Sequence, residues 1–342
     1  MAIAILAALL IPASNLQLGS ADPDTITKAG AAKEGLDALE ETGIGSGAIA
    51  PTETIVSEDG AQDVVTAQQQ VPGVHGAVAP SGPDWRRDGD AVVIAAPFEG
   101  DESESGRDAV EGLRDAAHSA AADARVGGVG PLNADFIDAV YGSFPLMIAM
   151  IALLTFLLLA RAFRSVLLPL KAVVLNVLSV GAAWGVMSLI WQSGHGSDEI
   201  WGIAATGSIA SWIPLMVFAF LYGLSMDYEV FILARMREEY DKTGDTDEAV
   251  IFGLGRTGRL VTSAALILFL AFVSMASGPE TDVKILATGL AAGILLDATV
   301  IRALLVPAVV SLFGSWNWWL PPGLARLLRV PPSPQPAAGA GG

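Results

Sequence analysis

The chain lacks cysteine altogether and has only 3 histidines among its 342 residues. Without cysteine there is no disulfide, no thiol nucleophile and no thiolate metal ligand. The histidines, at positions 75, 118 and 195, are far apart in the sequence, so we predict no metal site. The chain also has no GxSxG, HExxH or Walker motif. An enzyme activity therefore has no candidate residues, and no cofactor is predicted.

Charged side chains are also scarce. Asp, Glu, Lys and Arg make up 16% of the chain, whereas hydrophobic residues make up 52%, and the mean hydropathy is +0.53. Soluble globular domains carry about a quarter charged residues. The composition therefore indicates an integral membrane protein.

The few charges are unevenly distributed along the chain. Residues 14–138 hold 23 acidic and 7 basic side chains, a net charge of −16, whereas the whole chain carries −17. The sequence therefore predicts a strongly acidic soluble domain attached to a nearly neutral membrane block. A negative surface repels nucleic acid and anionic lipid headgroups, so neither is expected to bind this domain.

The first 13 residues, MAIAILAALLIPA, are apolar but span only about half of a bilayer. They lack the positive start of a signal peptide. We interpret residues 1–13 as the end of a transmembrane helix whose beginning is missing, and a weak uncleaved anchor is the alternative.

Residues 14–138 read as an α+β domain. An amphipathic helix with Ala32, Leu36 and Leu39 on one face precedes strand and helix patterns in the order βαββαβ. The clearest strand is AVVIAAP, which follows Asp90 and a predicted turn, SGPDWRRDGD. This order is typical of a small ferredoxin-like domain.

Residues 139–313 predict five membrane helices. We place them at Ala139–Ala160, Ala172–Ser197, Ser208–Arg235, Leu260–Gly278 and Val283–Phe313. The loop RAFRS and the segment 235–259 are rich in arginine, whereas the opposite loops hold only Lys284. The positive-inside rule puts the basic loops in the cytoplasm and the acidic domain outside the cell.

Residues 314–342 form a predicted cytoplasmic segment. Trp316, Trp318 and Trp319 have the composition of an aromatic belt at the membrane surface, and Arg326 and Arg329 follow them. The end of the chain, PPSPQPAAGAGG, is expected to be disordered.

Asp227 is the most unusual residue of the membrane block. It follows the uncharged run 200–226, so it lies inside a predicted membrane helix with Tyr228 beside it. An ionised carboxylate at that depth costs at least a few kcal/mol, unless it is protonated, paired or hydrated. Asp227 and Tyr228 therefore become candidates for proton coupling, and helix packing by a satisfied carboxylate is the alternative.

Three further ionisable residues interrupt the apolar helices. Glu229 is expected nearer the cytoplasmic end, facing the loop or an arginine. Asp297 and Arg302 lie five positions apart, slightly out of register for an ion pair on an ideal helix. They either hold two helices together or take part in a proton path, and Ser225 is a possible polar supporter. Small residues such as Gly289 and Gly293 permit close helix contact.

Three long stretches resemble one known family. They are GLSMDYEVFILARMREEY, AVIFGLGRTGRLVTSAALIL and LATGLAAGILLDATVIRALLVPAVVSLFGSWNWWLP. Together they resemble the C-terminal half of a transporter of the MMPL (mycobacterial membrane protein large) family, a branch of the resistance-nodulation-division superfamily. The resemblance extends over essentially the whole chain and is most specific from about residue 133 to residue 321.

The resemblance implies an architecture and a mechanism. Family members have twelve membrane helices in two repeats of six, each with an extracytoplasmic porter domain, and they export lipids, glycolipids, siderophores or drugs by proton influx. The implied fold is the second six-helix repeat, with residues 1–13 as a truncated helix seven. The family's helix-ten proton relay matches Asp227 and Tyr228, and Asp297 and Arg302 match a recurrent pattern in the last helix.

The first repeat, with the partner Asp-Tyr pair, is absent from this sequence. We therefore expect a multi-pass protein of the cytoplasmic membrane that supplies the second half of a proton-driven exporter of lipids or other hydrophobic molecules. It would be a fragment, would work with a separate N-terminal half, or would self-associate. The alternative from another class is a membrane scaffold or sensor that does not transport, in which Asp227 only packs.

Overall fold

The computed structural model describes residues 1–20, 23–26 and 30–331. The chain divides into two compact units. The membrane unit contains Met1–Asn15, Phe144–Ser188 and Ile213–Gly342, and the α+β unit contains Leu16–Ser143 and Leu189–Trp212. Helix α6 (Val129–Phe163) begins in the α+β unit and ends in the membrane unit.

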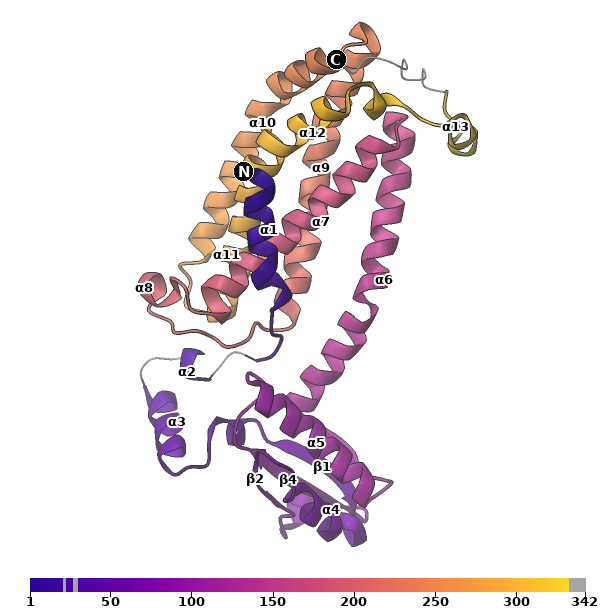
Figure 1. Cartoon of the computed structure of the whole chain (residues 1–342). Helices are drawn as coiled ribbons and strands as arrows, with labels where there is room; N and C mark the ends of the chain where they lie inside the picture. The colour runs from indigo at the N-terminus through magenta and orange to yellow at the C-terminus, as the bar shows by residue number, and fades with distance from the viewer. Residues whose placement is uncertain (21–22, 27–29, 332–342) are drawn as a thin grey trace. The chain divides into compact units, whose positions relative to one another are not determined.

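The α+β unit is built around a small antiparallel sheet (Figure 1). Its helices and strands are α2 (Pro23–Ile26), α3 (Ala31–Glu41), η1 (Ser46–Ile49), β1 (Thr52–Ser57), η2 (Glu58–Gly60), α4 (Ala61–Gln68), β2 (Val74–Val78), η3 (Pro83–Trp85), β3 (Arg86–Arg87), β4 (Asp90–Pro97), α5 (Glu104–Ala120), β5 (Arg125–Gly128) and α8 (Ser197–Trp201).

The strands pair in the order β2-β4-β1-β5, and the short β3 pairs with β4. All pairings are antiparallel; Thr52 of β1, for example, lies opposite Ala95 of β4 on one side and Gly128 of β5 on the other. The strand β3 occupies part of the segment for which the sequence predicted a turn. Its two arginines form a short hairpin with the start of β4.

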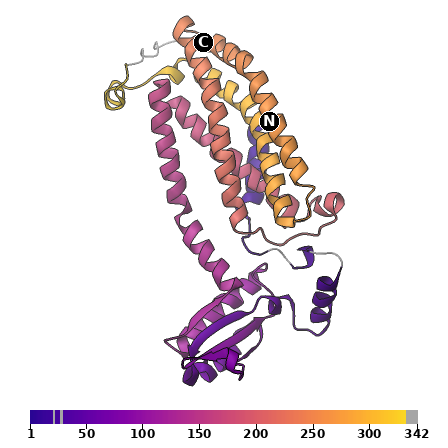
Figure 2. The ribbon, with the colours of Figure 1, turned by 180° about the vertical axis from the view of Figure 1, so that it is seen from behind.

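The core of the α+β unit lies on one face of the sheet. Every second residue of β4 is buried, including Ala91, Val93 and Ala95, as expected for a strand with one covered face. Helices α4 and α5 cover that face (Figures 1 and 2), and Leu113 of α5 is fully buried against it. Ser103 caps α5 by accepting a hydrogen bond from the Gly106 amide at 2.9 Å.

The membrane unit is almost entirely helical. Besides the end of α6, it contains α1 (Ala2–Ser14), α7 (Leu167–Met187), α9 (Trp212–Thr243), α10 (Thr246–Met275), α11 (Thr281–Leu296), the π-helical segment η5 (Asp297–Leu305), α12 (Val306–Phe313), η6 (Gly314–Trp318) and α13 (Pro322–Leu328). A second π-helical segment, η4 (Ser188–Gln192), continues α7 into the α+β unit.

Within the described residues, five helices are long and apolar enough to cross a membrane. They are Val129–Phe163, Leu167–Gln192, Trp212–Thr243, Thr246–Met275 and Thr281–Trp318. Each predicted span overlaps one of them, but the helices extend beyond the uncharged runs. The fourth begins at Thr246 rather than Leu260, because Asp245 caps it by accepting a hydrogen bond from the Glu248 amide at 2.9 Å.

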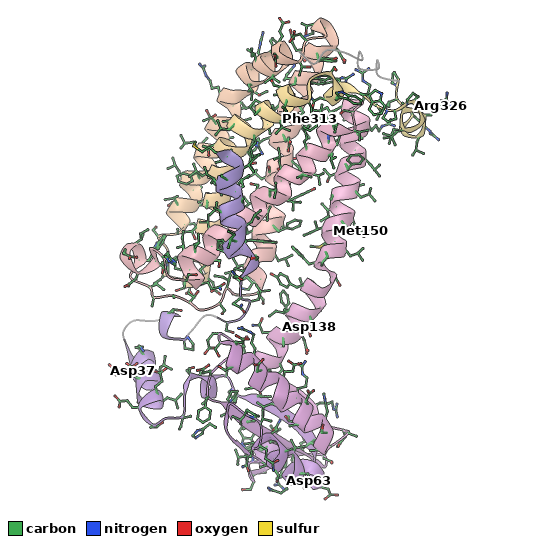
Figure 3. The ribbon with its side chains drawn as sticks, viewed as in Figure 1. Asp37, Asp63, Asp138, Met150, Phe313 and Arg326 are labelled. Carbon is green, nitrogen blue, oxygen red and sulfur yellow. The ribbon has the colours of Figure 1, made fainter. Side chains whose placement is uncertain are left out.

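The exposed apolar residues of these helices fit a membrane-spanning role. Met150 on α6, labelled in Figure 3, is 64% exposed, and it lies in a run of exposed leucines on the same helix. In water such a surface would aggregate. The protein is therefore a multi-pass membrane protein.

Glycines allow the helices of the bundle to approach closely. A Cβ atom on Gly185 of α7 would lie 1.8 Å from the Leu9 carbonyl oxygen of α1. On α11, a Cβ atom on Gly289 would lie 2.3 Å from Met187, and one on Gly293 would lie 2.2 Å from Leu221. The prediction that these two α11 glycines permit close helix contact is confirmed.

The aromatic residues near the C-terminus do not all lie at a membrane surface. Trp318 is 2% exposed, stacks on Tyr240 of α9 with a ring-centroid distance of 4.3 Å, and donates a hydrogen bond to Thr246 at 3.0 Å. The aromatic-belt prediction is therefore wrong for Trp318, because packing against α9 buries its ring. Trp316 is exposed. The predicted disordered end, from residue 332 onward, lies outside the described residues.

The contact between α1 and α7 generates a stability prediction. Gly185→Ala should destabilise the membrane unit by about 1–3 kcal/mol, because the added methyl group overlaps the Leu9 carbonyl. Thermal unfolding of the purified chain in detergent should show a lower Tm.

Gly258→Ala is the matched control, since no atom lies within 4 Å of the position of its Cβ atom. Its Tm should be unchanged or higher, because alanine favours a helix over glycine by roughly 0.5–1 kcal/mol. Equal Tm values for the two variants would contradict a close α1–α7 contact.

Candidate functional site

A cluster of buried polar side chains lies inside the membrane unit. Three segments contribute to it, α7, α9 and η5, and its members are Asn176, Ser225, Glu229, Asp297 and Arg302. Apolar side chains surround them, so each polar group must find a partner inside the bundle or carry a large desolvation cost.

An ion pair between Asp297 and Arg302 forms the centre of the cluster. The Arg302 Nη2 atom lies 2.5 Å from the Asp297 Oδ2 atom, and both side chains are buried. Five positions turn through about 140° away from one face in an α-helix. In a π-helix the hydrogen bonds join residues five apart, so such residues share a face. The prediction that the two are out of register is wrong, because they lie on π-helical η5.

Ser225 connects this ion pair to α9. The Arg302 Nη2 atom donates to the Ser225 carbonyl oxygen at 2.6 Å and to its Oγ atom at 2.9 Å. The Ser225 hydroxyl in turn lies within hydrogen-bond reach of the Asp297 carboxylate, at 2.9 Å, and of the Asn176 side-chain oxygen. The ion pair lies within η5, and its hydrogen bonds to Ser225 connect it to α9.

Glu229 lies deeper in the bundle than predicted. Its residue surface is 5% exposed, and its Oε2 atom accepts a hydrogen bond from the Asn176 Nδ2 atom at 3.1 Å. No cation of the described residues lies within ion-pair distance of it. The expectation that Glu229 faces a loop is wrong, because α9 turns this side chain into the packed interior. The arginine near it is Arg302, which forms its ion pair with Asp297 and not with Glu229.

Asp227 and Tyr228 lie on different sides of α9. The Asp227 side chain is exposed and makes no hydrogen bond or ion pair with any described residue. Tyr228 is half-buried, and the Arg302 guanidinium carbon lies 5.0 Å from the centroid of its ring. This distance fits a cation–π contact. The structure therefore brings Tyr228 to the edge of the cluster and leaves Asp227 outside it.

Asn176 is the member of the cluster that sequence reasoning missed. It donates to Glu229 and also lies 3.1 Å from the sulfur of Met226. The signal was present, since Asn176 is a side-chain amide inside an otherwise apolar stretch of α7. Such a residue costs free energy in a bilayer unless another helix satisfies it.

The charges of the cluster suggest what it can do chemically. Its two carboxylates, Glu229 and Asp297, have one guanidinium near them, Arg302, which forms an ion pair with Asp297 alone. With both acids ionised, the cluster carries one excess negative charge in an apolar interior, and one bound proton removes it.

The chain matches the model of the MMPL family over residues 58–334. It is 34% identical to the "Mycolic acid-containing lipids exporter MmpL11" of Mycolicibacterium smegmatis, over 95% of this chain and 35% of that protein. It is 35% identical to the "Heme uptake protein MmpL11" of Mycobacterium tuberculosis, over 83% of this chain and 30% of that protein.

A third relative is the "Membrane protein YdfJ" of Bacillus subtilis, which is 31% identical over 95% of this chain and 46% of that protein. The chain spans less than half of the length of each of these relatives.

The ion pair generates a stability prediction. Arg302→Met should destabilise the membrane unit by about 3–5 kcal/mol, because it leaves the buried Asp297 carboxylate without its cation. The double variant Asp297→Asn with Arg302→Met should recover part of this loss, because no unpaired charge remains.

Unfolding of the single and double variants in detergent measures the coupling between the two residues. We expect a coupling of at least about 1 kcal/mol, in the range of residues that share one network. Strictly additive effects would show that the two side chains do not depend on each other.

Proposed function

Because the chain belongs to the MMPL family, we propose that it forms part of a proton-driven exporter of lipids or other hydrophobic molecules across the cytoplasmic membrane. Members of this family are transporters rather than enzymes. The observation that carries the proton-driven part is the buried cluster in which two carboxylates have one guanidinium near them. Binding and release of one proton there changes the net charge of the bundle interior.

Asp227 and Tyr228 are proposed as the proton relay. Asp227 lies on the exposed side of α9, where water or a further membrane segment can reach its carboxylate. Tyr228 follows Asp227 in the chain, and its ring contacts Arg302 of the buried cluster. A proton that enters from outside neutralises Asp227, and its release to the cytoplasm restores the charge.

The ion pair and Ser225 connect this proton cycle to helix movement. Arg302 bonds both to Asp297 on η5 and to Ser225 on α9. A change of charge on α9 therefore acts on the position of η5 through the same guanidinium. We propose that the resulting shift of the two helices drives the movement of cargo.

The α+β unit is proposed as an extracytoplasmic, ferredoxin-like porter domain. The support is its strand order, β2-β4-β1-β5, with two helices on one face. A further support is the group of arginines at the end of α6, in the second half of α9 and in the first half of α10, which under the positive-inside rule favours a cytoplasmic position for these helix ends and for the C-terminus. The membrane unit would then be the second six-helix repeat, with α1 as the end of its first helix.

The cargo is proposed to be lipidic or otherwise hydrophobic. One relative is named for the export of mycolic acid-containing lipids and another for heme uptake, and both ligands are large and largely apolar. We propose that the rest of the transporter is the remainder of a longer chain, a separate N-terminal half or a second copy, because these residues span less than half of the relatives. No nucleic acid is expected to bind it.

The relay predicts a transport defect. In the complete transporter reconstituted in proteoliposomes, Asp227→Asn should reduce cargo transport driven by a pH gradient by at least about tenfold, since a group that must bind a proton is lost. Tyr228→Phe should reduce it less, because the ring facing Arg302 remains.

Asp198→Asn is the matched control, since Asp198 is an exposed acid on α8 of the α+β unit. This variant should transport like the unchanged protein, and collapse of the gradient should stop both. Undiminished, gradient-dependent transport by Asp227→Asn would refute the relay. Cargo binding that ignores the gradient in every variant would favour a scaffold instead.

A further inference from the structure

Glu229 stands out among the described acids of the membrane unit because it is buried without a cation. It is 5% exposed and accepts a single hydrogen bond, from Asn176. Arg302 is already bonded to Asp297 and Ser225. A buried carboxylate needs a close cation or several donors to stay ionised. Among the described residues, Glu229 is therefore a buried acid of the membrane unit without an ion pair.

A small cavity lies beside Glu229. Helices α7, α9 and α12 line it, and only two of its lining side chains are polar, Glu229 of α9 and Lys171 of α7. The others are leucines and valines. The cavity offers about 10 Å³ to the centre of a water molecule, which is room for about one water.

Lys171 is held rigidly at this cavity. Its ammonium donates to the Val309 carbonyl oxygen at 3.0 Å and to the Asn317 side-chain oxygen, and it lies 4.1 Å from the centroid of the Phe313 ring. Phe313 ends α12 (Figure 3). The fully buried Asn317 is itself fixed by donating to the Val310 carbonyl oxygen at 2.6 Å. These contacts place a positive charge against the cavity.

The Lys171 ammonium can donate one more hydrogen bond than the described residues accept. An ammonium carries three donors, and the described residues supply two acceptors, Val309 and Asn317. The third donor has no acceptor among the residues that the structure describes. A water in the cavity that Lys171 lines together with Glu229 would supply this acceptor.

We propose that Glu229 and Lys171 form a second proton-binding pair, separate from Asp227 and Tyr228. Glu229 binds the proton, and on release the proton passes to water in the cavity and leaves at the Lys171 end of the bundle. Lys171 is a positioning residue, because its charge stabilises the carboxylate that remains. The inference builds on the proposed proton-driven function and adds a path from the interior to the end of the bundle where α7 begins.

Several charged or titratable groups face Glu229. Asp297 and Arg302 lie on η5, Tyr222 lies on α9 itself, and Lys171 lies on α7. Asp297 and Arg302 carry opposite charges and are bonded to each other, so removing Arg302 would unpair Asp297. Lys171 is therefore the cation whose removal should change the proton affinity of Glu229 without unpairing another buried acid.

The test measures proton binding rather than transport. The chain is placed in lipid nanodiscs, and the C=O stretching band of protonated carboxylic acids is followed by difference infrared spectroscopy as the pH is raised. Glu229→Gln should remove one titrating component of this band. Lys171→Met should move that component to higher pH by about half a unit or more, because a nearby positive charge favours the carboxylate.

Lys242→Met is the matched control, since Lys242 is an exposed lysine that pairs with Glu238 far from the cavity. It should leave the component in place, and so should Asp227→Asn. Lys171→Arg keeps the charge and should titrate like the unchanged protein, so it serves if Lys171→Met fails to fold.

A band that Glu229→Gln does not change would overturn the proposal, and so would equal midpoints for the Lys171→Met and Lys242→Met variants. If Lys171→Met does not fold, Lys171→Gln takes its place as the variant without the charge. Equal midpoints for Lys171→Gln and Lys171→Arg would then overturn the proposal. The infrared titration needs no cargo. It can therefore support the Glu229–Lys171 pair even if the transport test refutes the Asp227 relay, and the transport test can support the relay even if the titration refutes the pair.

Discussion

The ion pair between Asp297 and Arg302 is the interaction on which the interior of the membrane unit depends. Ionised groups are costly in an apolar bundle, so each must be bonded to another. Arg302 meets this requirement for Asp297 and at the same time bonds to the backbone and side chain of Ser225. One guanidinium therefore satisfies a buried acid and fixes the position of two helices.

The two acids of α9 differ in their surroundings. Asp227 and Glu229 are two positions apart, and the helix places one on an exposed side and the other in the packed interior. Neither has a cation of its own among the described residues. In the proposed mechanism, α9 therefore offers two places for protons that differ in their access to water. Asn176 and Lys171 of α7 complete the inner one.

The sequence allowed some of these features to be predicted and concealed others. Long uncharged runs predicted the five apolar helices, but not their charged extensions, which depend on caps such as Asp245. Composition suggested a surface role for Trp318, whereas its burial depends on a stacking partner in α9, Tyr240. Asn176 lies in an apolar stretch whose partners come from a distant helix, so local patterns alone did not show which groups would satisfy its amide.

The π-helical geometry of η5 changes how its sequence should be interpreted. An acid and a base that share a face of an α-helix are three or four positions apart, but here they are five apart and still bonded. Deleting any one residue between them would restore the spacing of an α-helix and rotate every following side chain, including the valines of α12 that line the cavity near Lys171. The number of residues between Asp297 and Arg302 is therefore linked both to the type of helix and to the direction in which the side chains of α12 point.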